Sequence, residues 1–203
     1  MTLTDCHGVV LAGGYSRRFG EAEKALVRVG NETMLQRVVD RVGVATGQVT
    51  ISCRRDQRGA FERLSFSPPV QFVTDPEDDC GPLFALHHVL KSVTKPFTAV
   101  VACDMPGVRP SVIHSLYERV GTADGAVPLL AAGIRQPLQA VYRTDPLRDA
   151  CQHQLETQTH SVSGAVDRLE IVDCAPETLG IEHDSHVLAN VNTRQELDRF
   201  ETE

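Results

Sequence analysis

Between residues 11 and 24 the chain reads LAGGYSRRFGEAEK, which brings three glycines, two arginines and a lysine close together. Glycine has no Cβ, so successive backbone N–H groups can approach an anion and point at phosphate oxygens. Arg17, Arg18 and Lys24 add positive charge to a chain whose formal net charge is −7. The spacing matches neither the P-loop nor the dinucleotide-binding motif. The residues alone leave two interpretations open: a phosphate-binding loop, or a glycine-rich turn between a strand and a helix.

Two carboxylates follow apolar runs that have the composition of buried strands. Asp104 ends the run FTAVVACD, and Asp75 ends FVTD. The carboxyl ends of parallel strands meet at one edge of a sheet, where ligand crevices form in α/β folds. Carboxylate oxygens are also the ligands that Mg²⁺ takes beside substrate phosphates. The local alternatives are a helix cap for Asp104 and a surface turn for Asp75.

Asn190 and Asn192 alternate in the segment LANVNTRQEL near the end of the chain. Alternate residues of an extended segment project to the same side. Buried amides there need hydrogen-bond partners, which a ligand phosphate or the water shell of a metal ion would supply. The alternative is an ordinary asparagine turn before a helix. Arg135 and Gln136, in an expected loop, also fit two roles: contact with a second substrate, or exposure to solvent.

Short apolar runs alternate with helical patterns along the chain, which is typical of strands joined by crossover helices. Val-rich runs indicate strands buried on both faces, as in a parallel sheet between two helical layers. We therefore predict a single-domain, doubly wound α/β fold whose mostly parallel sheet has an antiparallel addition in the C-terminal half. The expected strands are 8–12, 49–53, 70–73, 97–103, 125–130, 136–143 and 170–173, and the expected helices include 33–42, 81–93, 145–156 and 193–200.

Length and composition fit one globular domain over residues 1–203. No apolar run approaches the roughly 20 residues of a membrane helix, and no export signal begins the chain, so we expect a cytoplasmic protein without membrane contact. The net charge of −7, with scattered basic residues, argues against nucleic acid as a partner. The six cysteines include no C-x-x-C pair, which predicts buried free thiols rather than a metal site.

The segment 11–24 resembles the signature loop of the nucleotidyltransferases related to molybdenum cofactor guanylyltransferase, which read approximately L-A-G-G-x-S-x-R-x-G followed by an acidic residue and Lys. C-D-x-P at 103–106, G-P-L at 81–83 and N-V-N-T at 190–193 resemble further motifs of that family. These motifs stand in family order, and the resemblance covers most of the chain. It implies a Rossmann-like nucleotidyltransferase fold.

The resemblance further implies that the chain transfers GMP from GTP to the terminal phosphate of molybdopterin or its molybdenum form, releasing pyrophosphate, with Mg²⁺ as cofactor. It implies a nucleotide-binding half over about residues 1–107 and an acceptor-binding half over about 108–203. Lys24, Asp104 and Arg18 are the expected catalytic residues, and Asp104 is also the expected metal ligand. The implied GTP-binding residues are Leu11, Ala12, Gly13, Gly14, Ser16, Arg17, Lys24, Ser52, Asp75, Gly81 and Asp104, while Asn190 and Asn192 are expected to line the cleft.

Three positions depart from the family pattern. Glu23 precedes the lysine where the family usually has Asp, which is one methylene shorter. Ser52 stands where the bacterial enzyme has an Asn that contacts the nucleotide. Phe84 and Ala85 follow G-P-L where smaller residues are usual, and these positions bear on the choice of base.

The sequence also admits competing functions. One is transfer of CMP to the same pterin, against which Gly13 argues because the related cytidylyltransferases carry Ala there. Another is guanylyl transfer to a corrinoid cofactor precursor, against which the C-D-x-P and G-P-L strings argue. A third is nucleotide or cofactor binding without catalysis, against which Lys24 and Asp104 together argue. Transient contacts with proteins of cofactor biosynthesis and the oligomeric state stay open.

Overall fold

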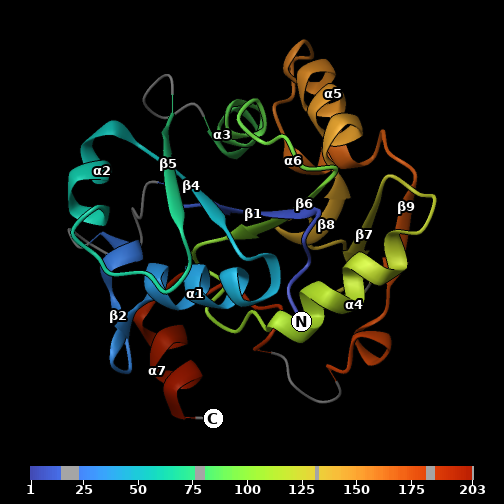
Figure 1. Ribbon diagram of the computed structural model, residues 1–203. Coiled ribbons are helices and arrows are strands. Elements are labelled where there is room, and N and C mark those ends of the chain that lie inside the picture. Colours follow the sequence, from blue (N-terminus) through green and yellow to red (C-terminus); the bar gives the residue numbers. More distant parts are fainter. Residues whose placement is uncertain (15–22, 76–80, 131–132, 182–185, 203) are drawn as a thin grey trace.

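A sheet of seven strands runs through the middle of the computed structural model, which describes residues 1–14, 23–75, 81–130, 133–181 and 186–202 (Figure 1). The strands of this sheet are β1 (Cys6–Leu11), β4 (Val49–Cys53), β5 (Val70–Thr74), β6 (Phe97–Ala102), β7 (Gly125–Pro128), β8 (Gln139–Arg143) and β9 (Ile171–Cys174). Two short strands, β2 (Arg28–Val29) and β3 (Glu32–Thr33), pair separately as a hairpin.

The order of the strands in the sheet is β5-β4-β1-β6-β8-β7-β9. β5, β4, β1 and β6 pair in parallel. β8 runs antiparallel to both of its neighbours, whereas β7 and β9 are parallel to each other. The predicted mostly parallel sheet with an antiparallel addition in the C-terminal half is therefore confirmed.

Helices cover both faces of this sheet (Figure 1). One layer contains α1 (Met34–Thr46) and α4 (Pro110–Val120), and the other contains α3 (Gly81–Leu90), α5 (Thr144–Leu155) and α6 (Val162–Val166). Neighbouring residues of one strand face different layers: Val10 packs in the core with α1 and α4, and Val9 packs in the core with α3 and α5. The continuous apolar runs are explained by this burial on both faces.

Two further helices lie beside these layers. α2 (Arg55–Phe61) follows β4 directly, and α7 (Arg194–Thr202) packs its Leu197 against Val29 and Met34. Thr193 caps the N-terminus of α7, because its Oγ1 accepts a hydrogen bond from the N–H of Glu196 over 3.2 Å. Sequence reasoning missed α2, α6 and the β2–β3 hairpin, which are too short to show a hydrophobic period.

The cysteines of the described residues are free thiols. They are all buried: Cys6, Cys53, Cys103, Cys151 and Cys174. Cys80 and the acidic run 77–79 lie outside the described residues. Within the described ranges no group of three or more His, Cys, Asp or Glu side chains could hold a metal ion. No helix there combines the length and apolar character that crossing a bilayer demands.

Gln139, at the start of β8, carries a stability prediction. Its side chain is fully buried, and neither its amide nitrogen nor its amide oxygen has a hydrogen-bond partner in the described structure. Leaving a buried amide without partners costs free energy, so we expect Gln139→Met to raise the free energy of unfolding by about 1–3 kcal/mol. Urea denaturation followed by circular dichroism measures this.

The matched control is Gln154→Met. Gln154 is also buried, but its amide nitrogen donates to Thr159 O over 2.6 Å and its amide oxygen accepts from Arg168 over 3.1 Å. This control should therefore lower the free energy of unfolding. Destabilisation of both variants to the same degree would contradict the interpretation that Gln139 is unsatisfied.

Candidate active site

Four parallel strands end at one edge of the sheet. The register pairs Leu11 with Ser52 in β4 and with Ala102 in β6, so these strands end level with one another. Residues with candidate roles therefore meet at this edge, as α/β ligand sites require. They are Gly13 after β1, Arg54 after β4, Asp75 after β5 and Asp104 after β6.

Lys24 and Asp104 form an ion pair at this edge, although they lie 80 residues apart in the chain. Lys24 Nζ lies 2.9 Å from Asp104 Oδ2 and 2.9 Å from Asn192 Oδ1. Asn190 Nδ2 donates to Asp104 Oδ1 over 2.9 Å. The two asparagine side chains therefore contact the same ion pair, Asn192 at the lysine and Asn190 at the carboxylate. We call these four residues the lysine–aspartate cluster.

Gln136 positions one residue of this cluster, Asn190, through a hydrogen bond. Its side-chain nitrogen donates to Asn190 Oδ1 over 3.1 Å and to Leu188 O over 3.3 Å. Because the oxygen of Asn190 accepts from Gln136, its nitrogen is directed toward Asp104. Gln136 is buried, so it does not belong to a solvated loop. Arg135, in contrast, is paired with Asp173 at 2.7 Å, away from the cluster.

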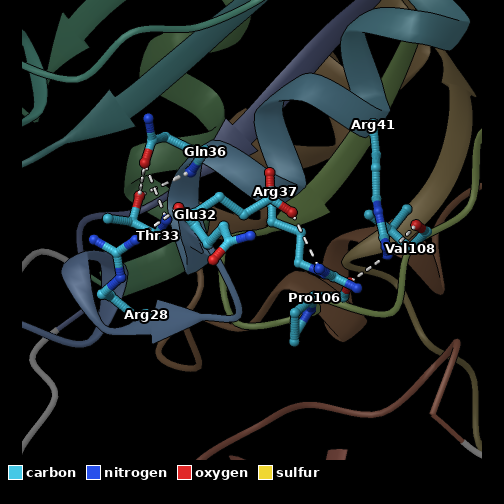
Figure 2. Close-up of polar contacts among 9 residues, drawn as sticks. Arg28, Glu32, Thr33, Gln36, Arg37, Arg41, Pro106 and Val108 are labelled. Carbon is cyan, nitrogen blue, oxygen red and sulfur yellow. Dashed lines mark hydrogen bonds and ion pairs between the residues drawn. The ribbon is translucent and has the colours of Figure 1, made fainter. Parts of the chain in front are cut away.

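The loop after Asp104 is held by two arginines of α1 (Figure 2). Arg41 Nη1 donates to Pro106 O over 2.6 Å and to Val108 O over 3.2 Å, and Arg37 Nε donates to Pro106 O over 3.2 Å. Burial lowers the pKa of Arg41. The following helix α4 takes Arg109 as its N-cap, so Asp104 does not act as the helix cap that the sequence left open.

Asp75 lies at the other end of the same edge, facing residues 12–14 after β1, which we call the glycine loop. Ser52 Oγ donates to Asp75 Oδ1 over 2.7 Å, and a Cβ placed on Gly13 would overlap Asp75 Oδ2. Asp75 is buried, so it is not a surface turn residue; burial raises its pKa, and the Ser52 hydrogen bond opposes that shift. Ser52 itself is fully buried. Its hydroxyl therefore orients the Asp75 carboxylate.

Arg54 is a site residue that sequence reasoning missed. Its guanidinium is buried and contacts the carbonyl oxygens of Gly13 and Gly14 as well as the carboxylates of Glu23 and Asp56. Burial disfavours its charge, but the hydrogen bond to Asp56 and the attraction of Glu23 raise its pKa overall. The available signal was its position: a charged residue directly after a buried strand, level with Asp75.

The other residues predicted to bind GTP are Leu11, Ala12 and Gly81, and those of the loop between 15 and 22. Leu11 and Ala12 are buried, and their backbone groups pair with the neighbouring strand ends: Ala12 N–H donates to Ser52 O over 2.8 Å, and Leu11 O accepts from Cys103 N–H over 2.9 Å. Gly81 begins α3 with φ of +80°, a backbone conformation that other residues adopt only with strain. The predicted residues of the loop between 15 and 22 lie outside the described residues: Ser16, Arg17 and Arg18.

The chain is similar to known proteins in both sequence and fold. Residues 8–170 match the family model of the MobA-like NTP transferase domain. A protein of Natronomonas pharaonis named "Probable molybdenum cofactor guanylyltransferase" is 33% identical over 197 residues, which cover 95% of each chain. A protein of Haloferax mediterranei with the same name is 32% identical over 94% of this chain and 90% of its own.

A solved structure shares the fold. Molybdopterin-guanine dinucleotide biosynthesis protein A from Archaeoglobus fulgidus superimposes with a TM-score of 0.78 over 97% of both chains, at 23% sequence identity. The match of the family model spans more than half of the chain, and the relatives exceed 30% identity over nearly its full length. The chain is therefore a nucleotidyltransferase that belongs to the family of MobA-like NTP transferase domains.

Proposed function

We propose that this protein transfers GMP from GTP to the terminal phosphate of molybdopterin or its molybdenum form, and that it releases pyrophosphate. The observation that carries the proposal is the pairing of Lys24 with Asp104 at the carboxyl edge of the sheet, where the glycine loop also begins. The names of the relatives support guanylyl transfer and this acceptor.

The reaction is an in-line displacement at the α-phosphorus of GTP, in which an acceptor phosphate oxygen attacks and pyrophosphate leaves. Nucleophile and leaving group are both anionic phosphates, so the protein has to position them and neutralise charge. The ammonium group of Lys24 would exchange Asp104 for the phosphate oxygens of the nucleotide. Arg18 and Arg17 would add charge on the same side. No side-chain nucleophile takes part in this scheme.

The donor set at Asp104 fits Mg²⁺. The Asp104 carboxylate, with 21% of its side chain exposed, provides hard oxygen ligands with access to solvent, and Asn192 Oδ1, which accepts from the same Lys24 ammonium group, is a further oxygen in the cluster. Protein sites that bind Mg²⁺ with substrate phosphates commonly supply only one or two carboxylates. Asp104 would hold the ion, which when bound offsets charge on the nucleotide and acceptor phosphates.

The test is incubation of the purified protein with each of the four NTPs, Mg²⁺ and molybdopterin, followed by mass analysis of the products and a pyrophosphate-release assay. We expect pyrophosphate and the guanine dinucleotide product with GTP. A cytosine dinucleotide product would assign the base differently, and nucleotide binding without any product would indicate a non-catalytic protein.

Lys24→Ala is expected to weaken GTP binding at least about tenfold and to lower turnover, because charge-assisted hydrogen bonds to phosphate are lost. Isothermal titration calorimetry with GTP measures the affinity. Lys91→Ala, which removes an exposed lysine after α3, is the control and should leave the affinity unchanged. Equal GTP affinity in both variants would remove Lys24 from the nucleotide site.

A further inference from the structure

Side chains at the start of α2 donate hydrogen bonds to the backbone carbonyls of the glycine loop. Three successive carbonyl groups of the loop accept hydrogen bonds from two side chains: Ala12 O from Gln57 over 3.2 Å, Gly13 O from Arg54 over 3.1 Å, and Gly14 O from Arg54 over 3.2 Å. The N–H groups of Gly13 and Gly14 donate to no acceptor among the residues that the structure describes. This is the arrangement a loop needs if its donors are to face an anion.

The same guanidinium also contacts the segment that precedes Lys24. Arg54 Nη2 lies 3.3 Å from Glu23 Oε2, while Nε and Nη2 contact the two oxygens of Asp56 at 3.1 and 3.2 Å. Only 7% of the Arg54 side chain is exposed, against 25% for Glu23 and 68% for Asp56. The cation is thus enclosed between the loop and the residue next to Lys24.

These contacts connect two parts of the site, and Gly14 in the first part lies nine positions before Glu23 in the second. The first part is the glycine loop, which follows β1. The second is the start of η1 (Lys24–Leu26), whose first residue contacts Asp104. Because the planar fork of an arginine presents its donors in a fixed geometry, it sets the spacing of the groups it bridges. Glu23, one methylene longer than the Asp that is usual at this position, contacts this guanidinium over 3.3 Å.

We infer that Arg54 is a positioning residue of the nucleotide site, which ties the carbonyls of Gly13 and Gly14 to Glu23 and so sets the place of Lys24 relative to the glycine loop. The inference rests on the proposed function, because it concerns the binding of the same GTP. Arg54 acts through the loop and Glu23 rather than by touching the nucleotide.

The test compares Arg54→Lys and Glu23→Gln with the wild type. A lysine keeps the charge but cannot serve two carbonyls and two carboxylates at once, so we expect the Kd and KM for GTP to rise roughly ten- to a hundredfold in Arg54→Lys. The KM for the acceptor should change less than about twofold, since the acceptor meets Asp104 and the asparagines. Titration calorimetry and steady-state kinetics measure these quantities, well below each variant's melting temperature.

Glu23→Gln keeps the shape of a partly exposed side chain and removes only its charge, so it tests the inference even if Arg54→Lys fails to fold. It should raise the Kd for GTP several-fold, and the double variant should lose less affinity than the product of the single losses, because both act through one contact. Arg58→Lys is the matched control: it alters an exposed arginine of α2 paired with Glu62, and GTP affinity should stay unchanged.

The outcomes separate the two proposals. If the wild type binds GTP and both Arg54→Lys and Glu23→Gln bind it equally well, the positioning role is overturned while the proposed function stands. Full additivity in the double variant also overturns it. If the wild type binds GTP but forms no dinucleotide product, the proposed function fails, and the Kd comparison still decides the role of Arg54. A wild type that binds none of the four nucleotides overturns both.

Discussion

Asp104→Asn is expected to lower turnover at least about a hundredfold while leaving the fold intact, because a neutral amide binds Mg²⁺ poorly and charge stabilisation supplies much of phosphoryl-transfer catalysis. The structure adds a second reason: Asp104 is the partner of Lys24 and Asn190, so its charge organises the lysine–aspartate cluster. Steady-state pyrophosphate release measures the loss. Binding of Mn²⁺ in the presence of GTP, followed by electron paramagnetic resonance, tests the metal separately and should weaken in parallel.

The matched control for this substitution is Asp145→Asn. Asp145 lies in the first turn of α5, where its exposed side chain pairs with Arg148, so turnover should be unchanged. Near-normal turnover of a correctly folded Asp104→Asn protein, with unchanged Mn²⁺ binding, would remove Asp104 from the metal site.

Gly13→Ala is expected to reduce the preference for GTP over CTP by roughly 10- to 150-fold, because a displaced or unpaired polar contact costs about 1–3 kcal/mol. In the structure the new Cβ would overlap Asp75 Oδ2, and the other oxygen of that carboxylate accepts a hydrogen bond from Ser52. Asp75 would have to move, so the substitution acts on base selection through that carboxylate. Competition kinetics with both nucleotides and one acceptor measure the ratio.

Gly14→Ala provides the comparison within the same loop. A Cβ on Gly14 meets no atom within 4 Å among the described residues, so the ratio of GTP to CTP should stay unchanged whatever the effect on overall binding. A wild-type protein that already prefers CTP, or an unchanged ratio in Gly13→Ala, would show that Gly13 does not govern the base. Phe84 and Ala85, after the start of α3, would then be the positions to exchange.

Much of the architecture was predictable from local patterns. Strands buried on both faces appear as continuous apolar runs such as Val49–Cys53, whose predicted and observed bounds agree. Helix N-caps such as Thr193 depend on residues three apart. The common direction of Asn190 and Asn192 follows from the two-residue repeat of an extended chain. These features are encoded within a few consecutive residues, so the sequence alone determined them.

The edge of the sheet was also predictable as the place of the site, because parallel strands bring their carboxyl ends together wherever they lie in the chain. That rule brought Asp75 and Asp104 to one edge. It says nothing about which side chains touch there, since side-chain contacts depend on distances that are set only when strands and helices pack.

Only the tertiary structure decided those contacts. The pairing of Lys24 with Asp104, the support of Asn190 by Gln136 and the hydrogen bond of Ser52 to Asp75 join residues that lie 80, 54 and 23 positions apart. Arg54 belongs to no recognisable motif. It reaches the carbonyl oxygens of Gly13 and Gly14 because it follows β4 directly and β4 pairs with β1. A polar side chain finds its partner by proximity in space, for which the sequence has no periodic signal.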